Sequence, residues 1–189
     1  MVSSGGKIVV ISGPSGVGKS TICREVVKKL DKVYLSISAT TRPKAPGEVE
    51  GRDYFFLTPE QFLEEVKAGN FIEYAKVFGH YYGTPKDKVE QAMAEGKTVI
   101  LEIDVQGGEQ IKRMYPNAKM IFILPPRQAD LVRRINDRGR DNLPDVQKRL
   151  AVAGTEIAAA WQCYKHMVIN DKLEQAVEEI VQIIKSPED

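Results

Sequence analysis

The segment GPSGVGKS at positions 13–20 contains the residues whose types and spacing most clearly suggest chemistry. It fits the pattern G-x-x-x-x-G-K-[ST], in which glycines let successive main-chain N–H groups converge on an anion. A helix that starts near Lys19 adds favourable dipole charge, and the lysine can reach the β- and γ-phosphates of a nucleotide. Ser20 can ligate Mg²⁺. The pattern predicts binding of ATP or a similar nucleotide by Gly13, Pro14, Ser15, Gly16, Val17, Gly18, Lys19, Ser20 and Thr21. A chance match is the alternative.

Two carboxylates follow a buried strand pattern. The segment TVILEID at positions 98–104 places Glu102 and Asp104 on one face of a strand, because side chains alternate with period two. We expect both near the mouth of the phosphate-binding segment, where Glu102 or Asp104 could hold Mg²⁺ through water. The alternative is that these acids only cap the following helix.

Arginines are concentrated between positions 126 and 150. Arg134 and Arg138 are four residues apart and share one helical face, where like charges repel unless an anion compensates. Arginine is suited to spread the charge of a transferring phosphoryl group. Acidic residues partly neutralise the segment, so a solvated helix of mixed charge stays open as an alternative. They are Asp130, Asp137, Asp141 and Asp145.

The elements that must position these residues have the pattern of an α/β protein. Apolar runs at 7–12, 33–38, 98–104, 119–124 and 166–170 alternate with helical patterns, which predicts a parallel sheet flanked by helices around a P-loop NTPase core. We expect a single domain over 1–189, with its core at 1–38, 97–125 and 164–189. Residues 39–96 form an expected insert with short strands near 54–56 and 71–77, and residues 126–163 an arginine-rich lid region.

Composition limits the classes of partner. The 189 residues carry a net charge of +1, so no global basic field predicts binding to nucleic acid or a membrane. No apolar run approaches the ~18 residues of a membrane span, and the polar N-terminus does not resemble a signal peptide. Cys23 and Cys163 lack metal-ligand spacing and are expected to be reduced, consistent with a cytoplasmic protein. Trp161 is expected to pack within a helix.

Several further motifs give the chain a resemblance to one family. ISGPSGVGKST, SATTR, PGEVEGRDYFF, FIEYAKVFGHYYGT, LEIDVQGG and VIND stand in the order and spacing of the guanylate kinase (GMP kinase) family of P-loop nucleoside monophosphate kinases. The resemblance extends from about Lys7 to Lys185. The phosphate-binding segment alone is shared by many unrelated NTPases, whereas the combination of TTR, PGE, FIE and YYGT is far more specific.

The resemblance implies transfer of the γ-phosphoryl group of MgATP to GMP, and to dGMP, with an inserted GMP-binding subdomain and an arginine-bearing lid. Catalytic roles are implied for Lys19, Arg42, Arg138 and Arg149. Guanine would be faced by Ser38, Glu73, Thr84 and Asp104, and the GMP phosphate would be held by Arg42, Tyr54 and Tyr82. Arg134, Arg138 and Arg149 would surround ATP, with Asn170 near the adenine.

Chemistry supports a guanine site independently of the resemblance. Guanine presents N1–H and N2–H₂ donors on one edge and O6 and N7 acceptors on another. A carboxylate such as Glu73 or Asp104 accepts from the donor edge, and adenine there would leave it unpaired at a cost of ~1–3 kcal/mol. No strong general base is needed, because the acceptor phosphate oxygen is already anionic. Without the family pattern, packing of a small insert would be the favoured interpretation of Tyr54 and Tyr82.

One position departs from the family pattern. The family has a second arginine three residues after the arginine of TTR, but this chain has Ala45 there, beside Lys44. The loss of a charge-assisted hydrogen bond to phosphate could cost ~1.5–3 kcal/mol of binding. We therefore treat Lys44 as a candidate substitute, acting as a point charge.

Two other functions stay open on the sequence alone. A kinase of another nucleoside or sugar phosphate could use the same fold, and guanylate-kinase-like modules can bind peptides without catalysis. The intact GKS segment favours an enzyme. Oligomeric state, rates and the preference between GMP and dGMP are not determined by the sequence.

Overall fold

The computed structural model describes residues 5–136 and 143–187, and a five-stranded parallel sheet lies at its centre. Its strands are β1 (Lys7–Ser12), β2 (Val33–Leu35), β7 (Thr98–Glu102), β8 (Lys119–Leu124) and β9 (His166–Ile169). The strand order is β2-β7-β1-β8-β9. β1 pairs with β7 and β8 on its two sides, with Val9 opposite Ile100 and Val10 opposite Met120. The predicted parallel sheet is confirmed.

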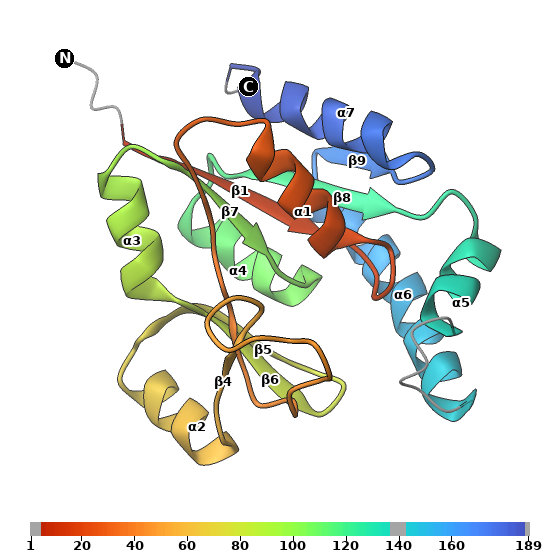
Figure 1. Cartoon of the computed structure of the whole chain (residues 1–189), viewed down its shortest axis with the longest axis horizontal. Helices are drawn as coiled ribbons and strands as arrows, with labels where there is room; N and C mark the ends of the chain where they lie inside the picture. Colours follow the sequence, from red (N-terminus) through yellow and green to blue (C-terminus); the bar gives the residue numbers. More distant parts are fainter. Residues whose placement is uncertain (1–4, 137–142, 188–189) are drawn as a thin grey trace.

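Helices cover both faces of this sheet, which explains why its strands are apolar throughout. Helices α1 (Lys19–Lys28) and α7 (Leu173–Lys185) lie on one face, and α3 (Lys86–Ala94), α4 (Val105–Met114) and α6 (Leu143–Cys163) on the other (Figure 1). Val9 and Ile11 pack in one apolar cluster, while Ile8 and Val10 pack in the opposite one. Helix α5 (Gln128–Asn136) follows β8 and packs against α6.

A second, four-stranded sheet is formed by the segment between β2 and α3. Its strands are β3 (Ala39–Thr40), β4 (Phe55–Phe56), β5 (Phe71–Val77) and β6 (His80–Pro85), in the order β4-β3-β6-β5. Helix α2 (Pro59–Lys67) starts with a capping box between Thr58 and Gln61. It buries Phe62, whose ring stacks on Phe71 and Tyr81 at 4.5 and 5.3 Å. This aromatic stack holds α2 on the small sheet.

Two expectations from the sequence need correction. The run at 33–38 forms a strand only as far as Leu35. Trp161 lies in a helix, α6, as expected, but the prediction that it packs there is wrong, because 66% of its surface is exposed. The buried face of α6 is formed by Ala153 and Ala160, and Trp161 follows the latter by one residue, which turns it away from that face.

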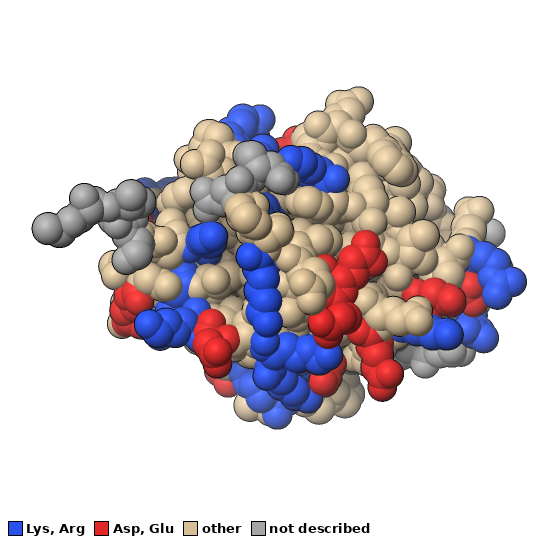
Figure 2. All heavy atoms as spheres, turned by 90° about the horizontal axis from the view of Figure 1, so that it is seen from above, with Lys and Arg blue, Asp and Glu red and all other residues tan. Residues whose placement is uncertain are grey.

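The surface carries charges of both signs. Figure 2 shows basic and acidic side chains interspersed over one face of the molecule, in keeping with the net charge of +1. Within the described residues, no helix has the length and apolarity needed to cross a membrane.

The close approach of α4 and α6 allows a test of packing. A Cβ added at Gly108 of α4 would lie 1.9 Å from Tyr164 Oη, whereas a Cβ at Gly154 of α6 would meet nothing within 4 Å. We expect Gly108→Ala to lower the free energy of unfolding by ~1–3 kcal/mol, because overpacking forces a shift of both elements. Gly154→Ala is the matched control and should be neutral or stabilising by up to ~1 kcal/mol. Urea denaturation of both variants measures the difference, and equal stabilities would contradict the packing argument.

Candidate active site

The phosphate-binding segment lies between the end of β1 and the start of α1, at the carboxyl edge of the central sheet. Gly13, Gly16 and Gly18 have positive φ values of 154°, 90° and 103°. A Cβ at Gly13 would lie 2.6 Å from the main-chain oxygen of Ile123, and one at Gly18 would lie 2.7 Å from Asn170 Nδ2. Glycine is therefore required here both by backbone conformation and by close approach.

Lys19 and Ser20 open α1 and face different partners. The Lys19 ammonium donates to the main-chain oxygens of Gly13 and Pro14, so it folds back over its own loop. Ser20 Oγ donates to Glu102 Oε1 at 2.6 Å. The hydroxyl predicted to ligate Mg²⁺ thus already lies against one of the two carboxylates predicted beside it.

Asp104 has the capping role that the sequence left open. It is the N-cap of α4, and its Oδ1 accepts from the N–H of Gly107 at 2.8 Å. Burial raises the pKa of Asp104, while this hydrogen bond and the charge of Lys19 oppose the rise. A capping role does not remove the residue from the site, because Lys19 is close enough to act on its charge.

Asn170 holds the phosphate-binding segment from the other side. Its Nδ2 donates to the main-chain oxygen of Val17 at 2.7 Å, and its own N–H donates to Leu124 at 2.8 Å. The residue predicted near the adenine therefore ties the end of β9 to the loop.

A buried polar pair lies between the two sheets. Glu73 of β5 and Thr84 of β6 are opposite each other in the strand register, and Thr84 Oγ1 donates to Glu73 Oε1 at 2.6 Å. Both side chains are buried, and a Cβ at Gly107 would lie 2.4 Å from Glu73 Oε2. Burial raises the pKa of Glu73 to about 7; the hydrogen bond from Thr84 opposes the rise and the charge of Asp104 adds to it. Ser38 is half-buried where the chain enters the small sheet, and its main-chain oxygen accepts from Phe55.

Arg42, Tyr54 and Tyr82 form a cluster at the edge of the small sheet. The guanidinium of Arg42 lies 5.3 Å from the centre of the Tyr54 ring, and the Tyr54 and Tyr82 rings are 6.1 Å apart. Burial raises the pKa of Tyr54, and the negative charge of Glu102 raises it further. Tyr54 is therefore near enough to Glu102 of β7 for the charge of that carboxylate to act on it.

The position without the family's second arginine is occupied by a turn. Glu48 accepts from the main-chain N–H of Ala45 at 2.8 Å and from Arg42 at 2.8 and 3.1 Å. Lys44 is exposed. Glu48, which the sequence analysis did not single out, therefore orients the arginine predicted to hold a phosphate.

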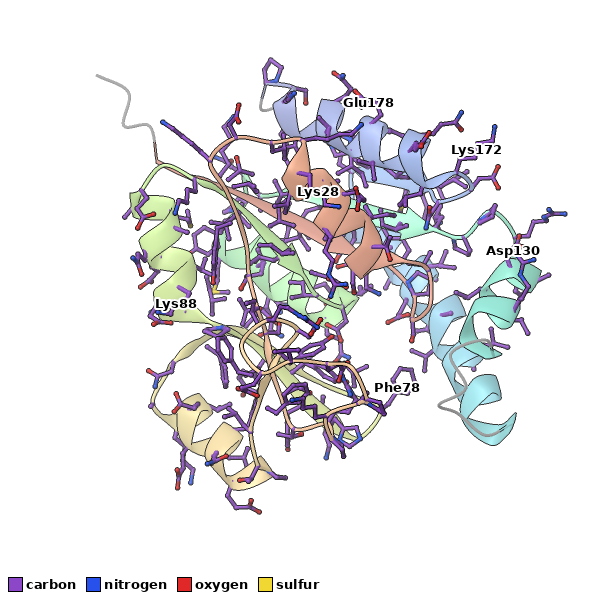
Figure 3. All side chains as sticks on the ribbon, viewed as in Figure 1. Lys28, Phe78, Lys88, Asp130, Lys172 and Glu178 are labelled. Atoms are coloured by element: carbon purple, nitrogen blue, oxygen red, sulfur yellow. The ribbon has the colours of Figure 1, made fainter. Side chains whose placement is uncertain are left out.

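Three arginines predicted near ATP are only partly placed. Arg134 belongs to α5 and Arg149 to α6, but their side chains lie outside the part of the chain that the structure describes. Arg138 lies wholly outside the described residues. In Figure 3, Asp130 marks α5 and Phe78 marks the turn between β5 and β6, and both elements lie toward the end of the sheet that carries the phosphate loop.

Sequence reasoning also missed Glu156 and Tyr164. Tyr164 Oη donates to Ser12 Oγ at 2.7 Å, which fixes the end of α6 to the end of β1. Glu156 is half-buried on the face of α6 that carries Ala153 and Ala160. Burial raises its pKa to about 7; Asp104 adds to the rise and Lys19 opposes it. Glu156 stands three residues after Ala153 and four before Ala160, so its position on the buried face could have been recognised from helical spacing.

The buried carboxyl of Glu73 allows a prediction of pH dependence. Its folded-state pKa of about 7 exceeds the unfolded value, so the folded state binds the extra proton between about pH 4.5 and 7. The stability of the native protein should fall across this window as pH rises, and Glu73→Gln removes this contribution. We expect the variant to gain roughly 1–3 kcal/mol relative to the native chain between pH 5 and pH 8, measured by urea denaturation. A difference that is constant with pH would contradict the assignment.

Comparison with known proteins agrees with this geometry. The guanylate kinase family model matches residues 5–187. A guanylate kinase of Thermosynechococcus vestitus is 47% identical over 182 residues, which cover 96% of this chain and 95% of the relative. A guanylate kinase of Thermotoga maritima is 48% identical, with 96% of this chain and 87% of the relative covered.

A solved structure has the same fold. The crystal structure of guanylate kinase from Anaplasma phagocytophilum superposes with a TM-score of 0.82 at 33% identity, covering 98% of this chain and 87% of the other. The family model matches from before β1 to beyond the end of α7, so both sheets and the phosphate-binding segment fall within the match. The chain belongs to the guanylate kinase family.

Proposed function

We propose that the chain transfers the γ-phosphoryl group of ATP, bound with Mg²⁺, to GMP or dGMP. Membership of the guanylate kinase family supports ATP-dependent phosphorylation of GMP as the reaction. The buried Glu73 is the observation that supports a guanine acceptor most directly. It accepts a hydrogen bond from Thr84 and lies beside Gly107 of helix α4, whose N-cap is Asp104. The alternatives, another phosphate acceptor or a module without catalysis, find less support in this arrangement.

The proposed guanine site uses the two edges of the base. Ionised Glu73 and Asp104 accept from N1–H and N2–H₂, and the hydroxyls of Ser38 and Thr84 serve the O6 and N7 edge. Burial raises the pKa of Glu73, so ionising this carboxyl is costly in the free protein. A bound guanine would donate hydrogen bonds to the carboxylate and would lower that cost. Adenine offers no matching donors at that edge and is rejected.

Separate groups of residues are proposed for the phosphates of ATP and of GMP. Lys19 and the main chain of 13–18 hold the ATP phosphates, with Arg134, Arg138 and Arg149 assigned to the ATP side. Arg42, Tyr54 and Tyr82 hold the GMP phosphate. Both Arg42 and Lys19 must exchange their present partners, Glu48 and the loop carbonyls, for phosphate oxygens. Transfer then depends on alignment and charge stabilisation, since the acceptor oxygen is already ionised.

The residues at the loop fit a magnesium site. Ser20 Oγ and Glu102 Oε1 are 2.6 Å apart, and hydroxyl and carboxylate oxygens are ligands that Mg²⁺ accepts. Among the described residues, no cluster of three or more His, Cys, Asp or Glu side chains could hold a metal by itself, which suits an ion bound largely through substrate phosphates. Ser20 would hold it, with Glu102 or Asp104 acting through water. Bound there, it would neutralise charge on the β- and γ-phosphates.

We propose a single domain with its core at 1–38, 97–125 and 164–189, a GMP-binding insert at 39–96 and a lid region at 126–163. The cytoplasm is the proposed location, in keeping with the free Cys23 and Cys163.

A panel of acceptors tests the proposed reaction. ADP release coupled to a spectroscopic assay should be rapid with GMP and dGMP and at least about 100-fold slower in kcat/KM with AMP, UMP and TMP, because a mismatched base leaves buried carboxylates unpaired. Preference for a base other than guanine would refute the acceptor assignment. Absence of turnover with every acceptor would favour the binding module.

The missing second arginine allows a separate test. Lys44→Ala should raise the KM for GMP about two- to fivefold if this exposed lysine supplies a point charge to the phosphate. Ala45→Arg should lower that KM about tenfold or more, since it restores a charge-assisted hydrogen bond. Lys28→Ala, on the far part of α1, is the control of equal charge loss. An unchanged KM in Lys44→Ala would exclude Lys44 as the substitute.

A further inference from the structure

Two side-chain contacts between the GMP-binding insert, residues 39–96, and the core bear on the proposed GMP site. On one side, β5 is fastened to α4, because Gln110 Nε2 donates to the main-chain oxygen of Tyr74 at 2.8 Å. On the other side, the loop before β4 reaches α1, where Arg24 Nη2 lies 2.7 Å from Asp53 Oδ1. The second contact joins the helix that begins at the ATP loop to the residue preceding Tyr54.

Asp53 organises the loop in which it lies. Its Oδ2 accepts from the main-chain N–H of Val49 at 2.8 Å and from Arg52 at 2.8 and 3.0 Å. These hydrogen bonds lower the pKa of Asp53. Only 11% of its side chain is exposed, so the carboxylate is an anchor for the loop and not a solvated surface charge. A movement of Asp53 would carry the adjacent Tyr54 with it.

Arg24 connects helix α1 to the loop that carries Tyr54. It stands four residues after Ser20, so both side chains lie on one face of the helix. Ser20 contacts Glu102 at the site proposed for Mg²⁺, and Arg24 contacts Asp53 beside the tyrosines proposed for the GMP phosphate. One face of α1 thus touches both halves of the site.

We propose that Arg24 is a positioning residue, which holds the GMP-phosphate cluster in register with the ATP loop through Asp53. The inference rests on the proposed function and adds to it a residue outside the family motifs considered above. Arg24 is assigned no contact with either nucleotide; it acts by holding Tyr54, and with it the site proposed for the GMP phosphate, in the position that binds GMP.

The effect of losing the pair is limited, because 60% of the Arg24 side chain is exposed and solvent screens the interaction. We expect Arg24→Ala to raise the KM for GMP about two- to fivefold, with kcat changed less than twofold and the KM for ATP unchanged. Arg24→Lys should give an intermediate value, because a lysine keeps the charge without the planar geometry. Lys28→Ala, one turn further along α1, is the control and should leave all three constants unchanged.

A double-mutant cycle with Asp53→Asn separates this role from general damage. Asp53→Asn should raise the KM for GMP more than Arg24→Ala, since it also weakens the contacts to Val49 and Arg52. If the pair acts as proposed, adding Arg24→Ala to Asp53→Asn changes the KM for GMP no further. Urea denaturation of Arg24→Ala checks that the fold is intact.

Three outcomes would overturn the inference: an unchanged KM for GMP in Arg24→Ala, equal increases for GMP and ATP, or fully additive effects in the double variant. The proposed function fails in a different way, because the native chain itself would then not phosphorylate GMP. Calorimetric titration of the native chain and of Arg24→Ala with GMP alone compares binding in the absence of turnover. We expect Arg24→Ala to raise the Kd for GMP two- to fivefold.

Discussion

The contact on which the rest of this site depends is the close approach of the main chain at 13–18 to the ends of β8 and β9. The loop passes so near Ile123 and Asn170 that a side chain at Gly13 or Gly18 would collide with them. Asn170 secures the approach by donating to Val17, and Tyr164 secures the end of β1 through Ser12. These contacts set where the main-chain donors point, and therefore where a triphosphate could lie relative to every other residue of the site.

Crowding of negative charge is the second constraint. Glu73 is buried, Asp104 and Glu156 are partly buried, and the pKa of each carboxyl is raised chiefly by burial. The charge of Lys19 opposes the rise at Asp104 and Glu156. A site of this kind is costly in the free protein and gains from ligands that bring donors or cations. In the proposed site, guanine would supply donors to Glu73 and Mg²⁺ would supply positive charge at Glu102, so both ligands would offset the cost of burying these carboxylates.

The insert must be held firmly enough to align two phosphates and yet admit a nucleotide. Its firm junction is the contact between β5 and α4, where Gln110 binds the backbone of Tyr74 and glycine at 107 allows Glu73 to approach. The junction through Arg24 and Asp53 is an ion pair in which 60% of the Arg24 side chain is exposed, so solvent screens it.

The sequence by itself determined the central sheet, the position of residues 13–20 between a strand and a helix, and the place of Glu102 at the end of its strand. Those features depend on local pattern: continuous apolar strands and glycines at fixed spacing. The expectation that Asp104 continues the same strand is wrong, because β7 ends at Glu102. The sequence did not determine that Asp104 also caps α4, that Glu48 holds Arg42, or that Trp161 faces solvent. Each of these depends on which face of an element meets which neighbour.

The same reason explains Glu156 and Arg24. Along the chain, one is a glutamate in an alanine-rich helix and the other an arginine in a helix of mixed charge. Only the packing of α6 over the end of β1 brings Glu156 near Lys19, and only the fold of the insert brings Asp53 to Arg24. Residues whose partners are close in the sequence can be recognised from the sequence pattern. Arg24 and Asp53 are 29 positions apart, so only the tertiary structure shows that they are partners.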